Sequence, residues 1–224
     1  MTLSRIAVLA SGRGSNLQAI LDAIDDGRLP ARIAGVFSDR PQAGALERVP
    51  PALRWSAKPS GFESRDAYEQ ALGDALAASG ADWIVCAGYM RILGPALIAR
   101  FAGRMLNIHP SLLPRHRGLH THAAALAAGD AEHGCSVHFV IPELDAGSLI
   151  AQARLPIAPG DTAETLAERV LALEHRLLPA VLQLAVSGQL SERDGMTFVG
   201  GQPRFTPLTL DFLERRMPDS DPTP

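Results

Sequence analysis

The first hundred residues alternate between short apolar runs and helically spaced segments, and this alternation constrains the fold more than any other feature. Ile6–Ala10 and Trp83–Ala87 are uninterrupted apolar runs. Such runs indicate strands covered on both faces, as central parallel strands are. After the first run, apolar side chains recur at helical spacing: Leu17, Ile20, Leu21 and Ile24. The order predicts an α/β fold, a doubly wound, mostly parallel, Rossmann-like sheet with helices on both faces.

The remaining elements follow the same alternation. Further strands are predicted at Ile33–Phe37, Arg104–Ile108, Ser136–Val140 and Ser148–Pro156, and helices after Ser64 and over Thr121–Ala128. A strand and a helix are also expected between Phe37 and Ser60, although that stretch is rich in proline and arginine. A long helix should begin near Asp161 with Glu164 as its capping-box partner, and Pro179 should kink or break it.

Composition narrows the class of protein. The 224 residues suit one domain, expected over residues 1–217, and the polar, proline-rich residues 218–224 are expected to be disordered. A net charge of -3 argues against a nucleic-acid partner. The first apolar run is too short for a signal peptide or a membrane span, so we expect a cytoplasmic protein with no membrane partner. Cys86 and Cys135 are expected to be buried, unpaired thiols.

A glycine turn, Ser11–Asn16, joins the first strand to the first helix. Free N–H groups at a helix start bind phosphate, and Gly12 and Gly14 let an anion approach the backbone closely. The turn therefore predicts a phosphate-monoester site. A dinucleotide site stays open because Asp39 stands near the ribose-binding position, although Leu17 replaces the third glycine. A tight turn without a ligand is the third alternative.

Asn107 and His109 stand two residues apart at the end of a predicted strand, so their side chains should point the same way. An amide donor beside an imidazole suits carbonyl chemistry, because the amide stabilises an oxyanion while the imidazole moves protons. Asp145, in a turn after the Ser136–Val140 strand, is the candidate to orient His109. A carboxylate there would fix the His109 tautomer and raise its pKa.

A metal site is the rival interpretation, because His116, His120, His122, His133 and His138 follow in the same region. Their spacing matches no standard zinc pattern, and no cysteine joins them. We therefore predict no metal and interpret His116, His120 and His122 as loop residues, some of them near the site.

An ordered set of short motifs covers almost the whole chain. The set consists of Ser11–Asn16, Ser64-Arg65, Gly88–Leu93, Asn107–Pro114, Gly118–His122, His133–His138, Asp145-x-Gly147 and Glu174-His175. With these motifs the chain resembles the phosphoribosylglycinamide formyltransferase family, folate-dependent enzymes of de novo purine synthesis. The resemblance implies that the amine of glycinamide ribonucleotide attacks the formyl carbon of 10-formyltetrahydrofolate.

The resemblance also implies roles for residues. Asn107 and His109 would stabilise the oxyanion, and Asp145 would raise the His109 pKa and order a water. The phosphate would be held by Gly14, Ser15 and Asn16, with Glu174 bonding the ribose. The folate site would be lined by Arg65, Met90, Arg91, Ile92 and Leu93, with Asn107 shared between the two substrates. The expected partners are these small-molecule substrates. The oligomeric state, monomer or homodimer, stays open.

Ser148 departs from the family pattern, which usually has proline after Asp-x-Gly. Two relatives share the Asn-x-His and Asp core. Formyltetrahydrofolate deformylase has an additional N-terminal domain, and methionyl-tRNA formyltransferase has an additional C-terminal domain for tRNA. A nicotinamide oxidoreductase and a non-catalytic phosphate-binding module are the alternatives from other classes.

Overall fold

The computed structural model describes residues 3–215, so the predicted disorder at 218–224 lies outside the described residues. Its strands are β1 (Ser4–Leu9), β2 (Ala31–Ser38), β3 (Arg54–Ser56), β4 (Trp83–Cys86), β5 (Met105–His109), β6 (Glu132–Phe139), β7 (Leu149–Pro156), β8 (Leu190–Arg193), β9 (Met196–Val199), β10 (Gln202–Arg204) and β11 (Leu208–Thr209). Its helices are α1 (Ser15–Asp25), α2 (Gly44–Glu47), α3 (Arg65–Ser79), α4 (Pro95–Arg100), α5 (Thr121–Ala127), α6 (Ala163–Val186) and α7 (Leu210–Glu214), with 3-10 turns at Pro51–Leu53 and Pro59–Gly61.

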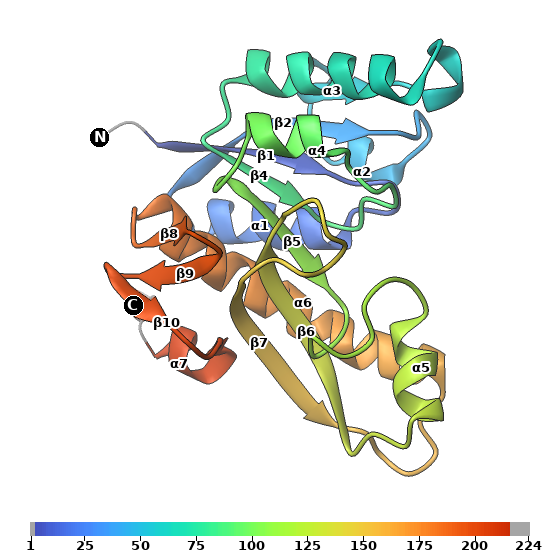
Figure 1. Ribbon diagram of the computed structural model, residues 1–224, viewed down its shortest axis with the longest axis vertical. Helices are drawn as coiled ribbons and strands as arrows, with labels where there is room; N and C mark the ends of the chain where they lie inside the picture. Colours follow the sequence, from blue (N-terminus) through green and yellow to red (C-terminus); the bar gives the residue numbers. More distant parts are fainter. Residues whose placement is uncertain (1–2, 216–224) are drawn as a thin grey trace.

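Eight strands form one sheet in the order β11-β7-β6-β5-β4-β1-β2-β3 (Figure 1). The run from β3 to β5 is parallel, β6 is antiparallel to both β5 and β7, and β11 is parallel to β7. The predicted mostly parallel α/β sheet is confirmed. Because ligands of such sheets bind beyond the carboxyl ends of the strands, that edge is where a site is expected.

The strand β1 shows why helices cover both faces. Successive side chains of a strand point to opposite faces, and all of Ile6–Leu9 is buried. Val8 packs in the core that contains the α1 and α6 side chains, whereas Leu9 packs with those of α3 and α4. In Figure 1, α3 and α4 accordingly lie on the opposite side of the sheet from α6.

The predicted capping box of α6 is wrong. The N-cap is Thr162, whose hydroxyl accepts from Thr165 N at 3.3 Å, while Thr165 Oγ1 accepts from Thr162 N at 2.9 Å. Asp161 is engaged elsewhere, because its carboxylate accepts from the Ala158 amide and pairs with Arg169. Glu164 lies in the first turn of the helix but is not the N3 residue of the box.

Pro179 does not break α6, which runs from Ala163 to Val186 without interruption. A proline inside a helix removes one hydrogen bond and costs about 3 kcal/mol. Here it lies within a run of fully buried side chains, including Leu177, Leu178 and Val181. Burying each such side chain contributes about 1.5–3 kcal/mol, so tertiary packing outweighs the local penalty.

The remaining elements differ little from the predicted ones. β6 begins at Glu132, four residues before the predicted strand, because Glu132 already pairs with Pro156 of β7. The strand and helix expected between residues 37 and 60 are present as the short α2 and β3. A small antiparallel sheet, β8 to β10, was not predicted. Cys86 and Cys135 are buried and unpaired, as predicted.

None of the helices within residues 3–215 combines the length and the apolarity that crossing a membrane requires.

Candidate active site

Asn107 and His109 end the strand β5, and the pleat directs both side chains to one side of the sheet. β5 is paired with β4 on one edge and with β6 on the other, so its end is held rigidly. His109 is buried, with 5% of its surface exposed. The two side chains are therefore presented at the carboxyl edge of the sheet, next to the turn that carries Asp145.

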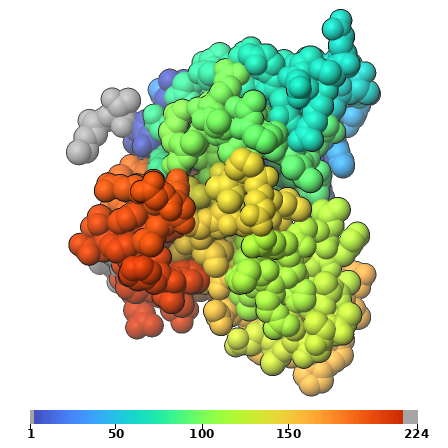
Figure 2. All heavy atoms as spheres, viewed as in Figure 1, coloured from blue at the N-terminus to red at the C-terminus, as the bar shows by residue number. Residues whose placement is uncertain are grey.

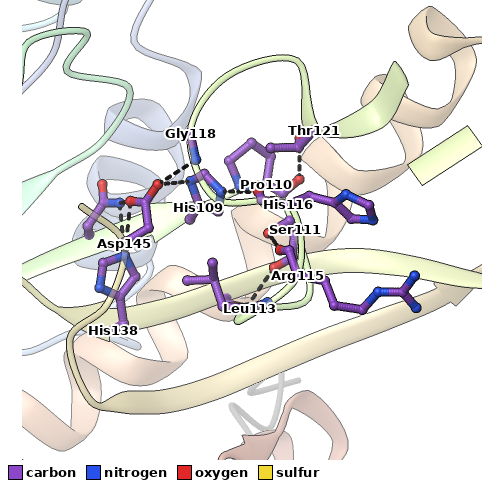
Figure 3. A network of polar contacts seen from close by, with 12 residues as sticks. His109, Pro110, Ser111, Leu113, Arg115, His116, Gly118, Thr121, His138 and Asp145 are labelled. Atoms are coloured by element: carbon purple, nitrogen blue, oxygen red, sulfur yellow. Dashed lines mark hydrogen bonds and ion pairs between the residues drawn. The ribbon is translucent and has the colours of Figure 1, made fainter. Parts of the chain in front are cut away.

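Asp145 lies in the segment between β6 and β7, which Figure 2 shows in yellow at the surface near the centre of this face. Its backbone is left-handed, with φ 48°. Asp145 Oδ2 accepts from Gly118 N at 2.9 Å and lies 3.5 Å from His109 Nδ1. Asp145 Oδ1 lies 3.5 Å from Asn107 Nδ2. The structure thus brings together the three residues predicted to be catalytic, and Figure 3 shows the carboxylate between His109 and His138.

Both ring nitrogens of His109 face acceptors. Nδ1 faces Asp145 Oδ2, and Nε2 lies 3.0 Å from the carbonyl oxygen of His116. A neutral imidazole has only one N–H, so either tautomer leaves a lone pair against an oxygen. Only the imidazolium can donate to both. The hydrogen-bonding geometry therefore favours protonation of His109 when the site acquires negative charge.

Burial opposes that preference and is the larger effect: it lowers the pKa of His109 below its ordinary value, although the His116 carbonyl and the Asp145 charge raise it. The Asp145 charge thus acts on the His109 pKa in the predicted direction, but burial has the larger effect. For Asp145 itself, burial raises the pKa, but hydrogen bonding with His138 and Gly118 N and the nearby histidine charges bring it below its ordinary value.

His138 is a site residue to which sequence reasoning gave no role. It lies directly opposite Asn107 in the β5–β6 register. His138 Nδ1 donates to the carbonyl oxygen of Phe139 at 2.8 Å, and His138 Nε2 lies 3.1 Å from Asn107 Nδ2. The ring therefore orients the Asn107 amide. The alternation of β6 was visible in the sequence, but its register against β5 was not.

A close approach of two backbone segments explains why the Asp-x-Gly motif has a glycine at Gly147. A Cβ at this position would lie 1.8 Å from the carbonyl oxygen of Phe139, where no side chain fits. The neighbouring Ser148 carbonyl accepts from Phe139 N at 3.1 Å, so the backbone after Asp145 is drawn tightly against β6. Ser148 Oγ is buried without a hydrogen-bond partner within residues 3–215.

Gly147→Ala is accordingly expected to destabilise the protein by about 1–3 kcal/mol, the usual cost of overpacking, and to displace Asp145. Urea unfolding measures the change. Gly61→Ala is the matched control because a Cβ at Gly61 meets no atom within 4 Å. A surface change of this kind should stay within about 0.5 kcal/mol. Equal midpoints for the two variants would contradict the steric explanation.

A pocket opens beside Asn107 and Asp145. Its lining residues are Cys86, Tyr89, Arg91, Ile92, Leu93, Ile98, Asn107, His138, Val140, Ile141, Pro142, Leu144 and Asp145. Of the residues predicted to bind folate, Arg91, Ile92, Leu93 and Asn107 are in this set. The walls that come from β6 and the segment after it were not foreseen, since nothing local marks those apolar side chains as lining a pocket.

Two predicted folate residues lie elsewhere. Arg65 does not line the pocket; it donates to the Ile92 carbonyl oxygen at 2.7 Å and pairs with Glu69 at 2.8 Å. Glu69 in turn accepts from Gly94 N at 2.9 Å. Arg65 therefore supports the pocket wall from outside. Met90 faces the opposite side of the same loop, towards the glycine turn.

The glycine turn forms a second hollow. It is lined by Ser11, Gly12, Arg13, Gly14, Ser15, Asn16, Arg40, Ala87, Gly88 and Met90. Gly14 precedes α1 with φ 76°, and a Cβ there would lie 2.7 Å from Ala45 Cα, so conformation and space both require glycine. Arg13 and Arg40 add two cationic side chains that the phosphate prediction did not include. Arg13 lies within the turn itself, whereas Arg40 follows β2 and reaches the hollow only because β2 pairs with β1.

Asn16 and Glu174 form a buried pair under this turn, with Asn16 Nδ2 donating to Glu174 Oε2 at 2.7 Å. Burial raises the pKa of Glu174 to about 7. Asn16 Oδ1 is buried with no partner among the described residues. One of the two hydrogens on Asn16 Nδ2, the side-chain donor predicted to hold phosphate, is thus bonded to Glu174, and Glu174 itself does not line the hollow.

His116, His122 and His133 lie close together. His116 Nε2 bonds to Asp130 at 2.8 Å, and His122 Nδ1 lies 3.1 Å from His133 Nε2. His116 contacts His109 through its carbonyl oxygen. Within residues 3–215 no group of three or more His, Cys, Asp or Glu side chains is arranged to hold a metal ion. The prediction of no metal stays a prediction.

The model of the formyl transferase family matches residues 4–182, most of the chain and all of the site. The chain is a member of the formyl transferase family. It is 44% identical over 199 residues to the phosphoribosylglycinamide formyltransferase of Escherichia coli (strain K12), covering 88% of this chain and 94% of that protein.

The chain is also similar to a solved structure and to part of a larger purine biosynthetic protein. A solved phosphoribosylglycinamide formyltransferase from Coxiella burnetii superposes with a TM-score of 0.88 at 45% identity, covering 93% of this chain and 99% of that chain. The trifunctional purine biosynthetic protein adenosine-3 of Drosophila pseudoobscura pseudoobscura is 44% identical over 192 residues, 83% of this chain and 14% of that protein. The family resemblance is confirmed, and formyl transfer is favoured over the nicotinamide and non-catalytic alternatives.

Proposed function

We propose that this enzyme transfers the formyl group of 10-formyltetrahydrofolate to the amine of glycinamide ribonucleotide, giving formylglycinamide ribonucleotide and tetrahydrofolate in de novo purine (IMP) biosynthesis. The observation that carries the proposal is the loop Gly88–Leu93, which separates two hollows. Gly88 and Met90 line the hollow of the glycine turn, whereas Tyr89 and Arg91 line the pocket that contains Asn107 and Asp145. Two substrates bound on either side of one loop would meet at the end of β5.

The chemistry requires a group that stabilises an oxyanion and a group that handles protons. As the amine nitrogen bonds to the formyl carbon, negative charge develops on the formyl oxygen. Asn107 Nδ2 would donate a hydrogen bond to that oxygen, and protonated His109 would donate one through Nδ1, whose 3.5 Å separation from Asp145 Oδ2 is longer than a normal hydrogen bond. When the bond from the carbon to the folate nitrogen breaks, one proton has left the amine and one reaches the folate nitrogen. His109, or a water ordered by Asp145, would carry it.

The glycine-turn hollow suits the phosphate of the ribonucleotide. Gly14 and Ser15 stand at the start of α1, where free N–H groups and the helix dipole favour an anion. Arg13 and Arg40 line the same hollow and add positive charge. Asn16 and Glu174 lie together beneath it, so we assign Glu174 the ribose hydroxyls, reached by reorienting the Asn16–Glu174 pair.

The pocket beside Asn107 suits the folate. Its apolar walls, Ile92, Leu93 and Ile98 among them, would hold a flat aromatic ring, and Arg91 at its edge would meet the carboxylates of the folate tail. Arg65 would act through the Ile92 carbonyl that it holds. Met90, on the other side of the loop, would contact the ribonucleotide instead.

The other assignments belong to the same proposal. Two buried free thiols suit a reducing compartment, so we place the enzyme in the cytoplasm. Residues 1–217 are proposed to act as one domain, its N-terminal half binding phosphate and its C-terminal half carrying folate binding and catalysis. No nucleic-acid or membrane partner is required, and a monomer and a homodimer are both compatible with the site.

The test is turnover. The purified protein is mixed with glycinamide ribonucleotide and 10-formyltetrahydrofolate, and release of tetrahydrofolate is followed. The proposal expects release that depends on the ribonucleotide. No turnover with this pair would refute it, and formate release without the ribonucleotide would identify a formyltetrahydrofolate deformylase instead.

A further inference from the structure

We propose that Ser11 is a positioning residue that couples the ribonucleotide hollow to the folate pocket, so that each substrate strengthens binding of the other. The inference rests on the proposed function for the identity of the two ligands. Ser11 is the first residue of the glycine turn, and it is buried, with 2% of its surface exposed. It directly precedes Gly12–Asn16, yet two of its hydrogen bonds run to the loop that forms the wall of the proposed folate pocket.

Three hydrogen bonds hold Ser11. Its backbone N–H donates to the carbonyl oxygen of Gly88 at 3.0 Å. Its hydroxyl donates to Asp39 Oδ1 at 2.6 Å and accepts from Met90 N at 2.9 Å. Because a carboxylate can only accept, Asp39 fixes the direction of the hydroxyl hydrogen and turns an oxygen lone pair towards Met90 N. Both ends of the Gly88–Met90 segment are thus tied to one serine.

The segment between these two bonds faces both ligand sites. Met90 lies on the phosphate side, and the residues flanking it, Tyr89 and Arg91, lie on the folate side. The Tyr89 hydroxyl is bonded to the Tyr68 hydroxyl at 2.8 Å, which anchors the folate-side surface of the loop. When an anion orders the glycine turn, Ser11 moves with it, and the Met90 amide must follow or lose a buried hydrogen bond. Arg91 is displaced by the same movement.

The experiment measures coupling rather than activity. The Kd of glycinamide ribonucleotide is determined by calorimetry without and with saturating tetrahydrofolate, which has no formyl group to transfer. We expect tetrahydrofolate to tighten ribonucleotide binding at least about fivefold in the unaltered protein, within the usual range of coupling between sites. In Ser11→Ala, which removes the acceptor for Met90 N, the ratio of the two Kd values should fall to nearly one.

Two further variants serve as a matched control and as a second test of the coupling. Ser38→Ala removes another fully buried serine hydroxyl, one that accepts from Arg40 N within its own turn, and it should keep the unaltered ratio. Asp39→Ala leaves the Ser11 hydroxyl unoriented and should reduce the ratio, so it replaces Ser11→Ala if that variant does not fold.

The outcomes separate the two proposals. Failure of the unaltered protein to bind glycinamide ribonucleotide would overturn the proposed function and this inference together. Binding of both ligands with a ratio near one in the unaltered protein, or with the same ratio in Ser11→Ala, would overturn the coupling alone. An equal loss in Ser38→Ala would show a general structural effect and would also overturn it.

Discussion

His109→Ala is expected to lower kcat by about 10²–10⁴-fold, since proton transfer and oxyanion stabilisation are each worth that much. The imidazole is the one group at the end of β5 that both carries a proton and lies against Asp145. KM for either substrate should change far less, because His109 does not line the pocket or the glycine-turn hollow. Steady-state kinetics with both substrates measures the separation of kcat from KM.

The control for this variant is His175→Ala in α6. His175 is also a partly buried imidazole, but it lines a separate hollow with Ser15 and Arg48, and none of Asn107, His109 and Asp145 lines that hollow. The control variant should keep kcat within a few fold. Thermal unfolding of both variants checks that the fold is retained. Near-normal kcat in a folded His109→Ala protein would mean that the catalytic centre is elsewhere.

Asp145→Ala is expected to lower kcat by about 10²–10⁴-fold as well, because the carboxylate organises the whole centre. It accepts from Gly118 N and lies 3.5 Å from both His109 and Asn107. Removing it frees the loop at Gly118 and leaves His109 Nδ1 without its acidic neighbour. The KM values should again change less than kcat, which the same kinetic measurements would show.

Asp145→Asn isolates the charge, because asparagine keeps the size of the side chain. The Asp145 charge raises the His109 pKa against the larger lowering by burial, so its removal must move that pKa further below 6.5. At a fixed pH a smaller fraction of His109 is then protonated. An NMR titration of the imidazole measures this directly, with Asp161→Asn, at the start of α6, as the control that should leave the pKa in place. A rise of the His109 pKa in Asp145→Asn would contradict the assigned contact.

Much of the fold could be predicted from local pattern. The apolar runs Ile6–Ala10 and Trp83–Ala87 are buried parallel strands because only a two-sided core tolerates such runs. The predictions failed where tertiary contacts outweighed a local rule. Pro179 remains inside α6 because the surrounding side chains are fully buried, and Thr162 caps that helix because the Asp161 carboxylate is engaged with Ala158 N and Arg169.

Some residues of the site could likewise be predicted from the sequence, and others could not. Asn107 and His109 could be paired from the sequence, since a spacing of two residues on a strand fixes a common side. Asp145 was only a candidate until the β5–β6–β7 register brought its loop back over them. His138 and the pocket walls contributed by the segment after β6 depend entirely on that register, which no local pattern encodes.

By itself, then, the sequence determined the α/β alternation, the glycine turn at the start of α1 and the Asn107–His109 pair. Each follows from chemistry and periodicity within a few neighbouring residues. Only the tertiary structure decided that burial lowers the His109 pKa despite Asp145, that Arg65 supports the wall of the proposed folate pocket from outside, and that Ser11 is bonded to the loop between the two hollows. Burial and hydrogen bonds between segments far apart in the chain set these properties, and they exist only once the sheet has formed.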